Sequence, residues 1–411
     1  MKNIIYLFLA AILAVSCTEN KTVTVTVNNP SSFDRNSEMV EISVNDLTAK
    51  LTSDNTKKLI VKDAANNEVP YQITYDNKLI FPVKVAAESS ATYTIGTGTP
   101  AEVETIATGR QYPERVDDMA WENDLVAFRA YGPALQATGE RAFGYDVWTK
   151  RDTSKPVVEA RYAMELNPET LAKIDSLKKV DPQAARDLRS ATSYHVDHGN
   201  GLDCYKVGPT LGGGTAALMV DGDIVYPYAY KTQEVLDNGP LRFTVKLTYN
   251  PLTVGADNNV IETRVISLDA GSYLNKTLIS YEGLSKATDI ATGLVLHEPD
   301  GTLTANAEEG FITYVDPTDN PNADNGKIFV GAAFPGDVKE AKPVYFSDKE
   351  KADRGANGHL LAISDYQPGS TYTYYWGSAW SKADIKTAAE WDSYVADFAA
   401  AIRQPLSVTI D

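Results

Sequence analysis

Val260-Ile261-Glu262-Thr263-Arg264-Val265-Ile266-Ser267-Leu268 is the stretch that indicates the fold most directly. Its side chains alternate in character over the whole length, as in an antiparallel strand with one buried face. Other strand-like runs occur from residue 101 onward, at 125–131, 144–149, 218–220, 241–249, 277–281, 310–315, 327–333, 360–364 and 371–376. No alternation of strand and helix is present, which argues against a doubly wound α/β fold. The pattern predicts a large antiparallel β domain.

A smaller β domain is predicted before it. Residues 22–27 alternate between Thr and Val, and residues 40–44 also alternate with period two. Turn residues separate further short strands, which are expected at 58–62, 71–75, 78–83 and 92–95. The stretch 96–100 has the composition of a linker. We therefore assign residues 17–100 to an N-terminal β-sandwich and residues 101–411 to the large domain.

Only two helical segments are expected in this all-β protein. The first, 168–188, is broken or joined near Asp181 and the proline that follows it. The second, 381–403, carries Trp391 and Phe398 at helical spacing, where core packing is the simplest interpretation. An alternating stretch at 406–410 ends the chain and predicts a final strand.

The N-terminus predicts export. Lys2 precedes an apolar run over residues 4–15, which is too short to span a bilayer. The sequence Leu13-Ala14-Val15-Ser16-Cys17 resembles the lipobox of bacterial lipoproteins. That resemblance implies removal of a signal peptide, residues 1–16, and lipidation of Cys17. An ordinary cleaved signal with a coincidental cysteine is the alternative. We expect a lipid-anchored protein of the bacterial cell envelope and leave the side of the membrane open.

Charge and cysteine content exclude some classes of protein. The formal net charge is −17, and removal of residues 1–16 takes away Lys2 and makes it −18. This acidic balance argues against a nucleic-acid partner, because phosphates repel such a surface. With Cys17 lipidated, Cys204 has no partner for an internal disulfide, so the core must supply the stability.

Several motifs occur together in an order that is typical of one family. They are Asn28-Asn29-Pro30, Phe33-Asp34-Arg35, Asp118-Met119-Ala120-Trp121-Glu122, Phe128-Arg129-Ala130-Tyr131, Gly144-Tyr145-Asp146-Val147-Trp148, Gly208-Pro209-Thr210-Leu211-Gly212 and Trp376-Gly377-Ser378-Ala379-Trp380. Over nearly all of the mature chain they resemble the bacterial lipoprotein family labelled domain of unknown function 4861. Gly239-Pro240-Leu241-Arg242 is similar to strand openings in galactose-mutarotase-like sandwiches. The resemblance implies a large mutarotase-like β-supersandwich and a role in polysaccharide degradation, and it supplies no catalytic residue.

The segment 194–206 concentrates reactive groups. It holds two of the four histidines, His195 and His198, together with Tyr194 and Lys206. Histidine titrates near neutrality and suits proton transfer. In a lyase, a histidine would remove the proton beside a uronate carboxylate, a tyrosine would supply the acid, and Arg129 or Lys206 would neutralise the carboxylate. Histidines that only order a loop through hydrogen bonds are the alternative.

A metal site is a further interpretation of the same histidines. With His297 they would offer three nitrogen ligands, a set that suits zinc or a similar divalent metal. The spacing is not one of the recognised zinc signatures. A divalent metal is therefore left open as a cofactor.

Trp121, Glu122 and Asp124 form a second candidate cluster. Trp can stack on a sugar face, and a carboxylate can bind hydroxyls or transfer a proton. Glu122 and Asp146 would be the two carboxylates of a glycosidase, whereas a capped turn before the strand 125–131 is the structural alternative. The remaining substrate-binding candidates are aromatic and basic residues of the quoted motifs and their surroundings: Tyr131, Trp148, Lys206, His297, Trp380 and Lys382.

We expect a carbohydrate-active lipoprotein that acts on glycan fragments. A poly- or oligosaccharide lyase is the leading hypothesis, with His195, His198, Tyr194, Glu122 and Arg129 as catalytic residues. A glycoside hydrolase or sugar epimerase, and a non-catalytic glycan-binding lipoprotein, are the alternatives. The expected partners are a carbohydrate, for which a uronate-containing oligosaccharide is one candidate, and the membrane through the lipid.

Overall fold

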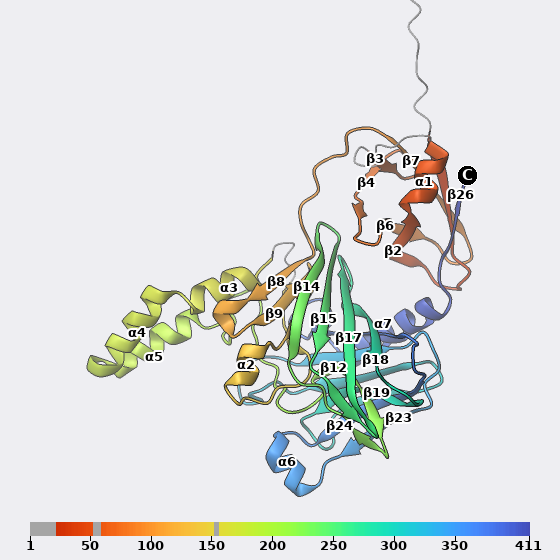
Figure 1. Ribbon diagram of the computed structural model, residues 1–411. Coiled ribbons are helices and arrows are strands. Elements are labelled where there is room, and N and C mark those ends of the chain that lie inside the picture. Colours follow the sequence, from red (N-terminus) through yellow and green to blue (C-terminus); the bar gives the residue numbers. More distant parts are fainter. Residues whose placement is uncertain (1–21, 52–58, 152–155) are drawn as a thin grey trace, which may run out of the picture.

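The structure is a computed structural model that describes residues 22–51, 59–151 and 156–411 (Figure 1). The expected all-β architecture is confirmed, because antiparallel sheets build both the small and the large domain. Cys17 and the signal segment 1–16 lie outside the described residues. In the described part of the chain no helix is long and apolar enough to cross a membrane.

The small domain is a sandwich of two sheets. The first has the strand order β26 (Ser407–Ile410), β1 (Val23–Asn28), β7 (Ser90–Thr97), β3 (Leu59–Lys62) and β4 (Glu68–Val69). The second has the order β2 (Arg35–Ser43), β6 (Lys78–Val85) and β5 (Gln72–Ile73). Helix α1 (Val44–Leu51) follows β2 directly, where the sequence predicted only a strand end. It forms because Val44, Leu47 and Leu51 bury one helical face against the sheets.

The last strand of the chain returns to the small domain. β26 pairs antiparallel with β1, with Ile410 opposite Val25 (Figure 1). Residues 407–410, which we assigned from the sequence to the large domain, therefore extend the first sheet. The chain passes between the domains twice, between β7 and β8 and again between α7 and β26.

The large domain is built on a nine-stranded and a five-stranded sheet. The larger sheet has the order β14 (Tyr230–Gly239), β15 (Arg242–Tyr249), β17 (Asp257–Asp269), β18 (Leu274–Glu282), β25 (Tyr372–Trp380), β22 (Ile328–Ala333), β21 (Phe311–Asp316) and β20 (Leu303–Asn306), with β16 (Leu252–Val254) beside β17. The smaller sheet has the order β13 (Asp223–Ile224), β12 (Gly213–Val220), β19 (Thr288–Leu296), β24 (Gly358–Tyr366) and β23 (Glu340–Tyr345). The predicted strand 260–268 lies within β17, and every second residue from Val260 to Leu268 is buried.

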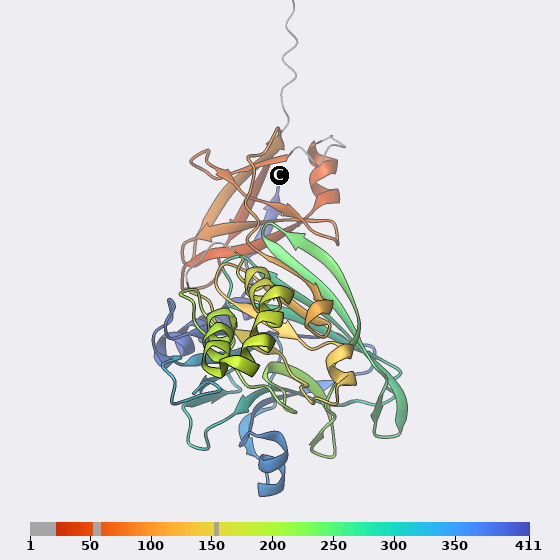
Figure 2. The same cartoon turned by 90° about the vertical axis from the view of Figure 1, so that its left-hand side faces the viewer.

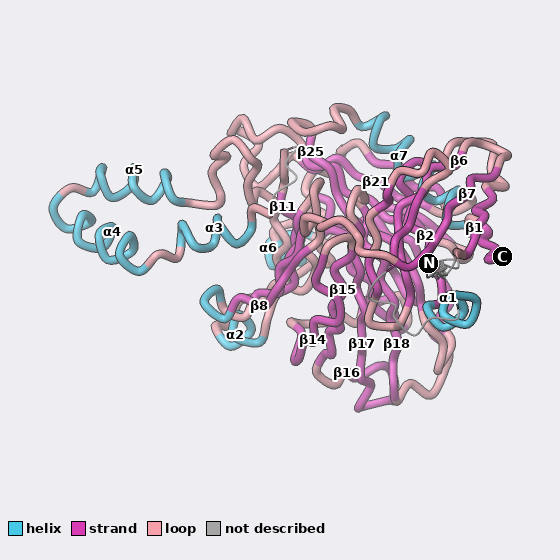
Figure 3. The backbone as a smooth tube through the Cα atoms, turned by 90° about the horizontal axis from the view of Figure 1, so that it is seen from above, coloured by secondary structure: helices cyan, strands magenta, loops and turns pink. Residues whose placement is uncertain are grey.

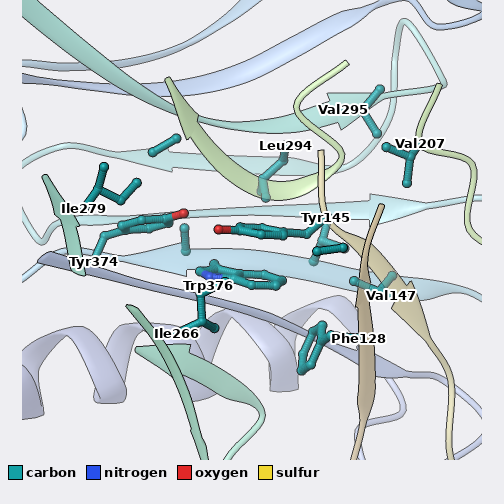
Figure 4. Packing of buried hydrophobic residues seen from close by; sticks show 14 of the residues in the cluster. Phe128, Tyr145, Val147, Val207, Ile266, Ile279, Leu294, Val295, Tyr374 and Trp376 are labelled. Carbon is teal, nitrogen blue, oxygen red and sulfur yellow. The ribbon is translucent and has the colours of Figure 1, made fainter. Parts of the chain in front are cut away.

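Aromatic rings fill the core of the large domain (Figure 4). Tyr145 and Trp376 stack with ring centroids 4.0 Å apart, and Tyr374 is also fully buried. Tyr374 and Trp376 of β25 are thus core residues. Gly214 lies against Trp376, where an added Cβ would come within 2.7 Å of the Trp376 Cβ. The backbone approaches closely there because glycine has no side chain.

A four-stranded sheet carries most of the candidate site. Its order is β11 (Asp146–Trp148), β10 (Ala127–Ala130), β9 (Asp118–Glu122) and β8 (Thr108–Tyr112). One face packs into the main core, and helix α3 (Val158–Glu165) packs against the other face. Because side chains alternate along a strand, Asp118, Arg129 and Asp146 all point to the face under α3.

Helices are more numerous than the two segments expected, since the described residues contain seven. α4 (Pro168–Val180) and α5 (Pro182–Thr192) form a hairpin that projects from the body (Figures 1 and 3) and points toward the viewer in Figure 2. The predicted break at Asp181 is confirmed, and its side chain caps α5. α7 (Ala388–Arg403) packs through Trp391 on the nine-stranded sheet. The short helices α2 (Pro133–Ala137) and α6 (Asp348–Arg354) and the 3-10 turn Pro113–Arg115 complete the set, and each is too short to show helical periodicity in the sequence.

Candidate active site

The loop that carries His195 and His198 is held by its own hydrogen bonds. Asp197 Oδ1 accepts a hydrogen bond of 3.0 Å from the backbone N–H of Gly201. His198 is exposed, and its Nε2 donates to the carbonyl oxygen of Ser193 at 2.9 Å. His198 thus contributes to the order of the loop, which is the structural alternative stated for it.

His195 lies at the outer edge of a buried group of charges. Its side chain is 51% exposed, and its Nδ1 donates to the carbonyl oxygen of Asp203 at 2.9 Å. Tyr194 points inward instead: it is buried, its ring stacks on Trp148 at 5.0 Å, and its hydroxyl accepts from Arg115 Nε at 3.0 Å. The two neighbours therefore have different surroundings, one open to solvent and one in the core.

Arg129 is the centre of a buried cluster of charges, which we term the ion cluster: Asp118, Arg129, Asp146 and Asp203. The guanidinium forms a close ion pair with Asp146 and lies 3.0 Å from Asp203 Oδ2 and 3.5 Å from Asp118 Oδ2. The three carboxylates come from β11, the loop after His198 and β9, and all are buried. Arg115 adds a more distant cation, 3.9 Å from Asp118. The carboxylates thus outnumber the cations around them.

Burial controls the protonation of this cluster. Desolvation raises the pKa of Asp118 to about 6, against the opposing effect of the Arg129 charge. Desolvation likewise raises the pKa of Asp146 and of Asp203, and Arg129 again opposes it. Two buried atoms of the cluster, Asp118 Oδ1 and Arg129 Nε, form no hydrogen bond within the described residues. Carboxyl groups with raised pKa values are a frequent property of sites that transfer protons.

A second polar group, which we term the histidine dyad, consists of His297 and Asp316. His297 follows β19, and Asp316 ends β21. Nδ1 of His297 donates to Asp316 Oδ2 at 2.6 Å, so the neutral imidazole keeps Nε2 free as an acceptor. The Asp316 side chain is fully buried and the His297 side chain is 10% exposed. This is the arrangement in which a carboxylate orients a histidine for work as a base.

Three buried polar atoms around the dyad have no hydrogen-bond partner in the described chain. They are His297 Nε2, Tyr205 Oη and Thr318 Oγ1. The rings of Tyr205 and His297 are 6.1 Å apart. Thr318 has φ +75°, a conformation that is rare for a β-branched residue, and its N–H donates to Asp316 Oδ1 at 2.9 Å. Because buried polar groups are nearly always paired, we expect a water molecule or a polar ligand to bind at these three atoms.

One short segment, residues 203–205, connects the ion cluster with the histidine dyad. Asp203 belongs to the ion cluster, and Tyr205 lies beside His297. Between them, the carbonyl oxygen of Cys204 accepts from the N–H of Asp319 at 2.8 Å. The Cys204 thiol is buried, and burial together with nearby carboxylates raises its pKa. It is therefore a packing residue rather than a nucleophile.

Glu122 is fully engaged in holding the structure together. Its carboxylate binds Lys150 Nζ at 2.7 Å and accepts hydrogen bonds from the N–H groups of Val157 and Val158 at 2.8 Å. The two amides lie at the start of helix α3, so the Glu122 carboxylate binds otherwise unpaired N–H groups and its negative charge offsets the positive end of the helix dipole. The capped turn that was the structural alternative for this cluster is formed by Asn123 instead, whose Oδ1 accepts from the N–H groups of Leu125 and Val126 at 2.9 and 3.0 Å.

The candidate aromatic residues are mostly internal. Trp121 is part of the main core, and its Nε1 donates to Asn275 Oδ1 at 2.8 Å. Trp148 is buried beneath Tyr194, and Trp380 donates from Nε1 to a backbone carbonyl. Tyr131 is half-buried and lies next to the Arg129 guanidinium, 5.2 Å from the ring centroid. Trp148 also lies next to this guanidinium, 5.3 Å from its ring centroid, so two of these four residues border the ion cluster, Trp148 as a buried residue and Tyr131 as a half-buried one.

The remaining charged candidates lie apart from the two groups. Asp124 Oδ1 accepts from the N–H of Gly271 at 2.8 Å, and Lys382 Nζ is 3.1 Å from Asp324. Lys206 is exposed. Within the described ranges, no group of three or more His, Cys, Asp or Glu side chains is arranged to hold a metal ion. The three histidines considered as metal ligands accordingly form no such site.

Sequence reasoning did not select Asp118, Asp203 or Asp316. Asp118 could have been found, because strand alternation places it on the same face of β9 as Glu122. Asp203 lies within the reactive segment that the sequence singled out. Asp316 carries no local signal, since its role depends on the packing of the nine-stranded sheet, which contains β21, against the five-stranded sheet, which contains β19.

The chain is a mostly antiparallel β-sandwich protein. It belongs to the family described as domain of unknown function DUF4861, whose family model matches residues 27–408. Uncharacterized protein P7 of Formosa agariphila is 26% identical over an alignment of 432 residues that covers 100% of both chains. The family resemblance drawn from the motifs is thus confirmed.

Two solved structures are similar in part. A protein in the glycosyl hydrolase family 38 from Enterococcus faecalis has a TM-score of 0.44 at 8% identity, covering 95% of this chain and 47% of that one. An alpha-mannosidase from Enterococcus faecalis V583 has a TM-score of 0.41 at 9% identity, covering 95% of this chain and 46% of that one. The chain spans about half the length of these two structures.

Proposed function

We propose that the protein is an enzyme that hydrolyses a neutral glycan by general acid–base catalysis at the histidine dyad. The observation that carries this proposal is the free, buried Nε2 of His297, with Asp316 holding the other ring nitrogen. A histidine oriented in this way is suited to act as a general base. The glycan as substrate class is what the motif resemblance implies.

Tyr205 is the proposed acid. Burial raises the pKa of its hydroxyl well above the ordinary value, so the group is protonated at neutral pH. In the reaction, a water oxygen attacks the anomeric carbon while His297 Nε2 takes the proton of that water. The bond from this carbon to the glycosidic oxygen breaks, and that oxygen receives the Tyr205 proton. A water molecule between the two buried groups then passes the His297 proton to Tyr205, so that the phenolate, which burial disfavours, does not persist.

The charge around the segment 203–205 favours hydrolysis over the lyase reaction that the sequence suggested first. Asp203, Asp316 and Asp319 all raise the pKa of Cys204 through their negative charge, so carboxylates surround this segment. A uronate would bring another carboxylate and would need a cation to neutralise it. Arg129 is already bound to the carboxylates of the ion cluster. A neutral substrate avoids this repulsion.

The test is an activity screen with neutral and uronate-containing oligosaccharides on the purified protein. Hydrolysis gives new reducing ends without ultraviolet absorbance, whereas elimination gives an unsaturated product that absorbs. We expect reducing ends only, and a loss of about 10²-fold to 10⁴-fold in kcat for His297→Gln and for Tyr205→Phe. An absorbing product would overturn hydrolysis in favour of the lyase.

His198→Gln is the matched control, because His198 is an exposed histidine of the loop. We expect it to keep the activity of the unmodified chain. All variants are compared by thermal unfolding, so that loss of activity in a folded protein is separated from misfolding. Equal activity in His297→Gln and His198→Gln would refute the dyad, and binding without any product would favour a glycan-binding lipoprotein.

We also propose export and lipid anchoring at Cys17, as the N-terminal sequence predicts. Growth with a labelled fatty acid should label the unmodified protein and leave Cys17→Ser unlabelled. Equal labelling of the two proteins would contradict lipidation at this position.

A further inference from the structure

A cavity of about 490 Å³ lies between the small and the large domain. The turn before β2 and part of β2 line it on one side, and the β17–β18 turn, β25 and α7 line it on the other. In Figure 1 this is the region where the small domain meets α7 and the chain that rises to β26. The volume falls within the range of ligand sites in proteins, which often form between domains.

The two domains are fixed to each other around this cavity. Arg242 of the large domain binds Glu41 of the small domain at 2.6 Å and Asp269 at 2.5 Å. Gln72 Oε1 accepts from the N–H groups of Leu241 and Arg242 at 2.8 and 2.7 Å. The walls are therefore formed before any ligand binds, which reduces the entropy lost on binding.

Arg35 closes the other end of the cavity. It binds Glu38 at 2.5 Å and Ser31 at 3.1 Å, and it donates to the carbonyl oxygen of Ala401 near the end of α7 at 3.2 Å. The guanidinium is buried and its donors are used within the protein. Arg35 and Arg242 are thus occupied by protein groups and are not free to bind an anion.

Three polar groups of the cavity are available to a ligand. Lys276, Asp397 and the Tyr375 hydroxyl line it, and none of them forms a hydrogen bond or ion pair with the rest of the described chain. Phe33 and Phe398 add half-buried aromatic rings, and Tyr375 contacts Phe398 with ring centroids 5.1 Å apart. The cavity thus combines ring surfaces with one carboxylate, one hydroxyl and one cation, Lys276, whose charge also acts on Glu41 without a direct ion pair.

We propose that this cavity binds a neutral pyranose oligosaccharide, as a site separate from the histidine dyad. A pyranose has C–H faces that pack on aromatic rings and a rim of hydroxyls that both donate and accept. Asp397 can accept from such a hydroxyl and Lys276 can donate to another, each as a charge-assisted hydrogen bond. Acidic side chains outnumber basic ones in the lining, which disfavours a uronate. The proposal does not require catalysis at the dyad.

Calorimetric titration with neutral trisaccharides, namely xylotriose, mannotriose and cellotriose, tests the proposal, with trigalacturonate as the acidic comparison. We expect at least one neutral trisaccharide to bind, and Lys276→Met and Asp397→Asn each to weaken it about tenfold or more. Tyr375→Phe should weaken it less, because the ring is kept. Lys276 and Asp397 lie at or near the surface, so their substitution should change the unfolding temperature little.

Lys342→Met is the control, because Lys342 lines a different cavity of about 720 Å³ on the outer side of the five-stranded sheet. We expect it to bind like the unmodified chain, and we expect His297→Gln to bind equally well. No binding up to about 10 mM, unchanged binding in Lys276→Met, or tighter binding of trigalacturonate would each overturn the inference. Loss of sugar binding in His297→Gln would also overturn the inference, because the sugar would then bind at the histidine dyad. Loss of activity with binding retained would leave the inference about the cavity unchanged.

Discussion

Asp118→Asn should make the protein more stable at neutral pH and leave its stability at pH 4 nearly unchanged. Asp118 is buried, and its pKa is raised from 3.8 to about 6, chiefly by desolvation. An acid whose pKa is raised by folding stabilises the native state most below its unfolded pKa. That contribution disappears as the pH rises through the folded pKa. Asparagine has nearly the same shape and cannot ionise.

The expected change in the free energy of unfolding follows from the pKa shift of Asp118. A shift of about two pKa units corresponds to about 3 kcal/mol, which the native chain loses between about pH 4 and pH 7. The difference in the free energy of unfolding between Asp118→Asn and the unmodified chain should therefore rise by about that amount over this range. The hydrogen bond from Tyr162, 3.2 Å from Asp118 Oδ2, can be kept by the amide oxygen.

Urea unfolding at several pH values, followed by tryptophan fluorescence, measures this difference. All five Trp residues lie in the large domain, so the signal reports the domain that contains Asp118. Asp175→Asn is the control, because Asp175 is an exposed acid on α4 beside Lys178. A difference that stays constant from pH 4 to pH 7 would refute the argument that burial raises the pKa of Asp118.

Three further predictions concern the core. Arg129→Met leaves three buried carboxylates without their central cation, and should cost about 3–5 kcal/mol at pH 7 and less at pH 4, measured by the same urea unfolding. Cys204 should resist maleimide at pH 8 until the protein is unfolded, because its thiol is buried and its pKa is raised; mass spectrometry of labelled peptides checks this. Gly377→Ala should destabilise by about 3 kcal/mol, because its Cβ would lie 1.9 Å from the Tyr273 oxygen. Thermal unfolding measures this loss, and Gly336→Ala is the control. An added Cβ at Gly336 meets open space, so this variant should change the stability little.

Most of the β architecture could be predicted because strand alternation is local. The run 260–268 predicted β17 correctly, because an alternating pattern indicates a strand with one buried face whichever strands lie beside it. Helix α1 was missed because it follows β2 without a break, and its three buried residues acquire meaning only against the sheets of the small domain. The pairing of β26 with β1 joins opposite ends of the chain, and no local pattern specifies a partner at that separation.

The candidate site was harder to predict because its chemistry depends on burial. His195 and His198 attracted attention as neighbouring histidines, yet both are largely exposed and bind loop carbonyl groups. Arg129 was expected to neutralise a substrate carboxylate, whereas in the structure it pairs with carboxylates from separate strands and a loop. His297 was expected to touch substrate, and only the fold places Asp316 against its ring. Desolvation and partner geometry are properties of the assembled chain and leave no trace in local sequence.

The ion cluster is connected to the histidine dyad through residues 203–205. Buried charges of this kind stabilise a fold little, because their desolvation offsets the Coulomb attraction. Here Arg129 fixes Asp203, the N–H of Asp203 donates to the carbonyl oxygen of Tyr194 at 2.9 Å, and Asp319 holds the next residue from the other side. Tyr205 follows Cys204, so these contacts hold the backbone on the N-terminal side of Tyr205 in place. A site that transfers protons requires such fixed positions, because a displacement of about 1 Å reduces the rate strongly. The ion cluster is therefore best understood as the support that positions Tyr205, and Arg129 as a positioning residue for the proposed reaction.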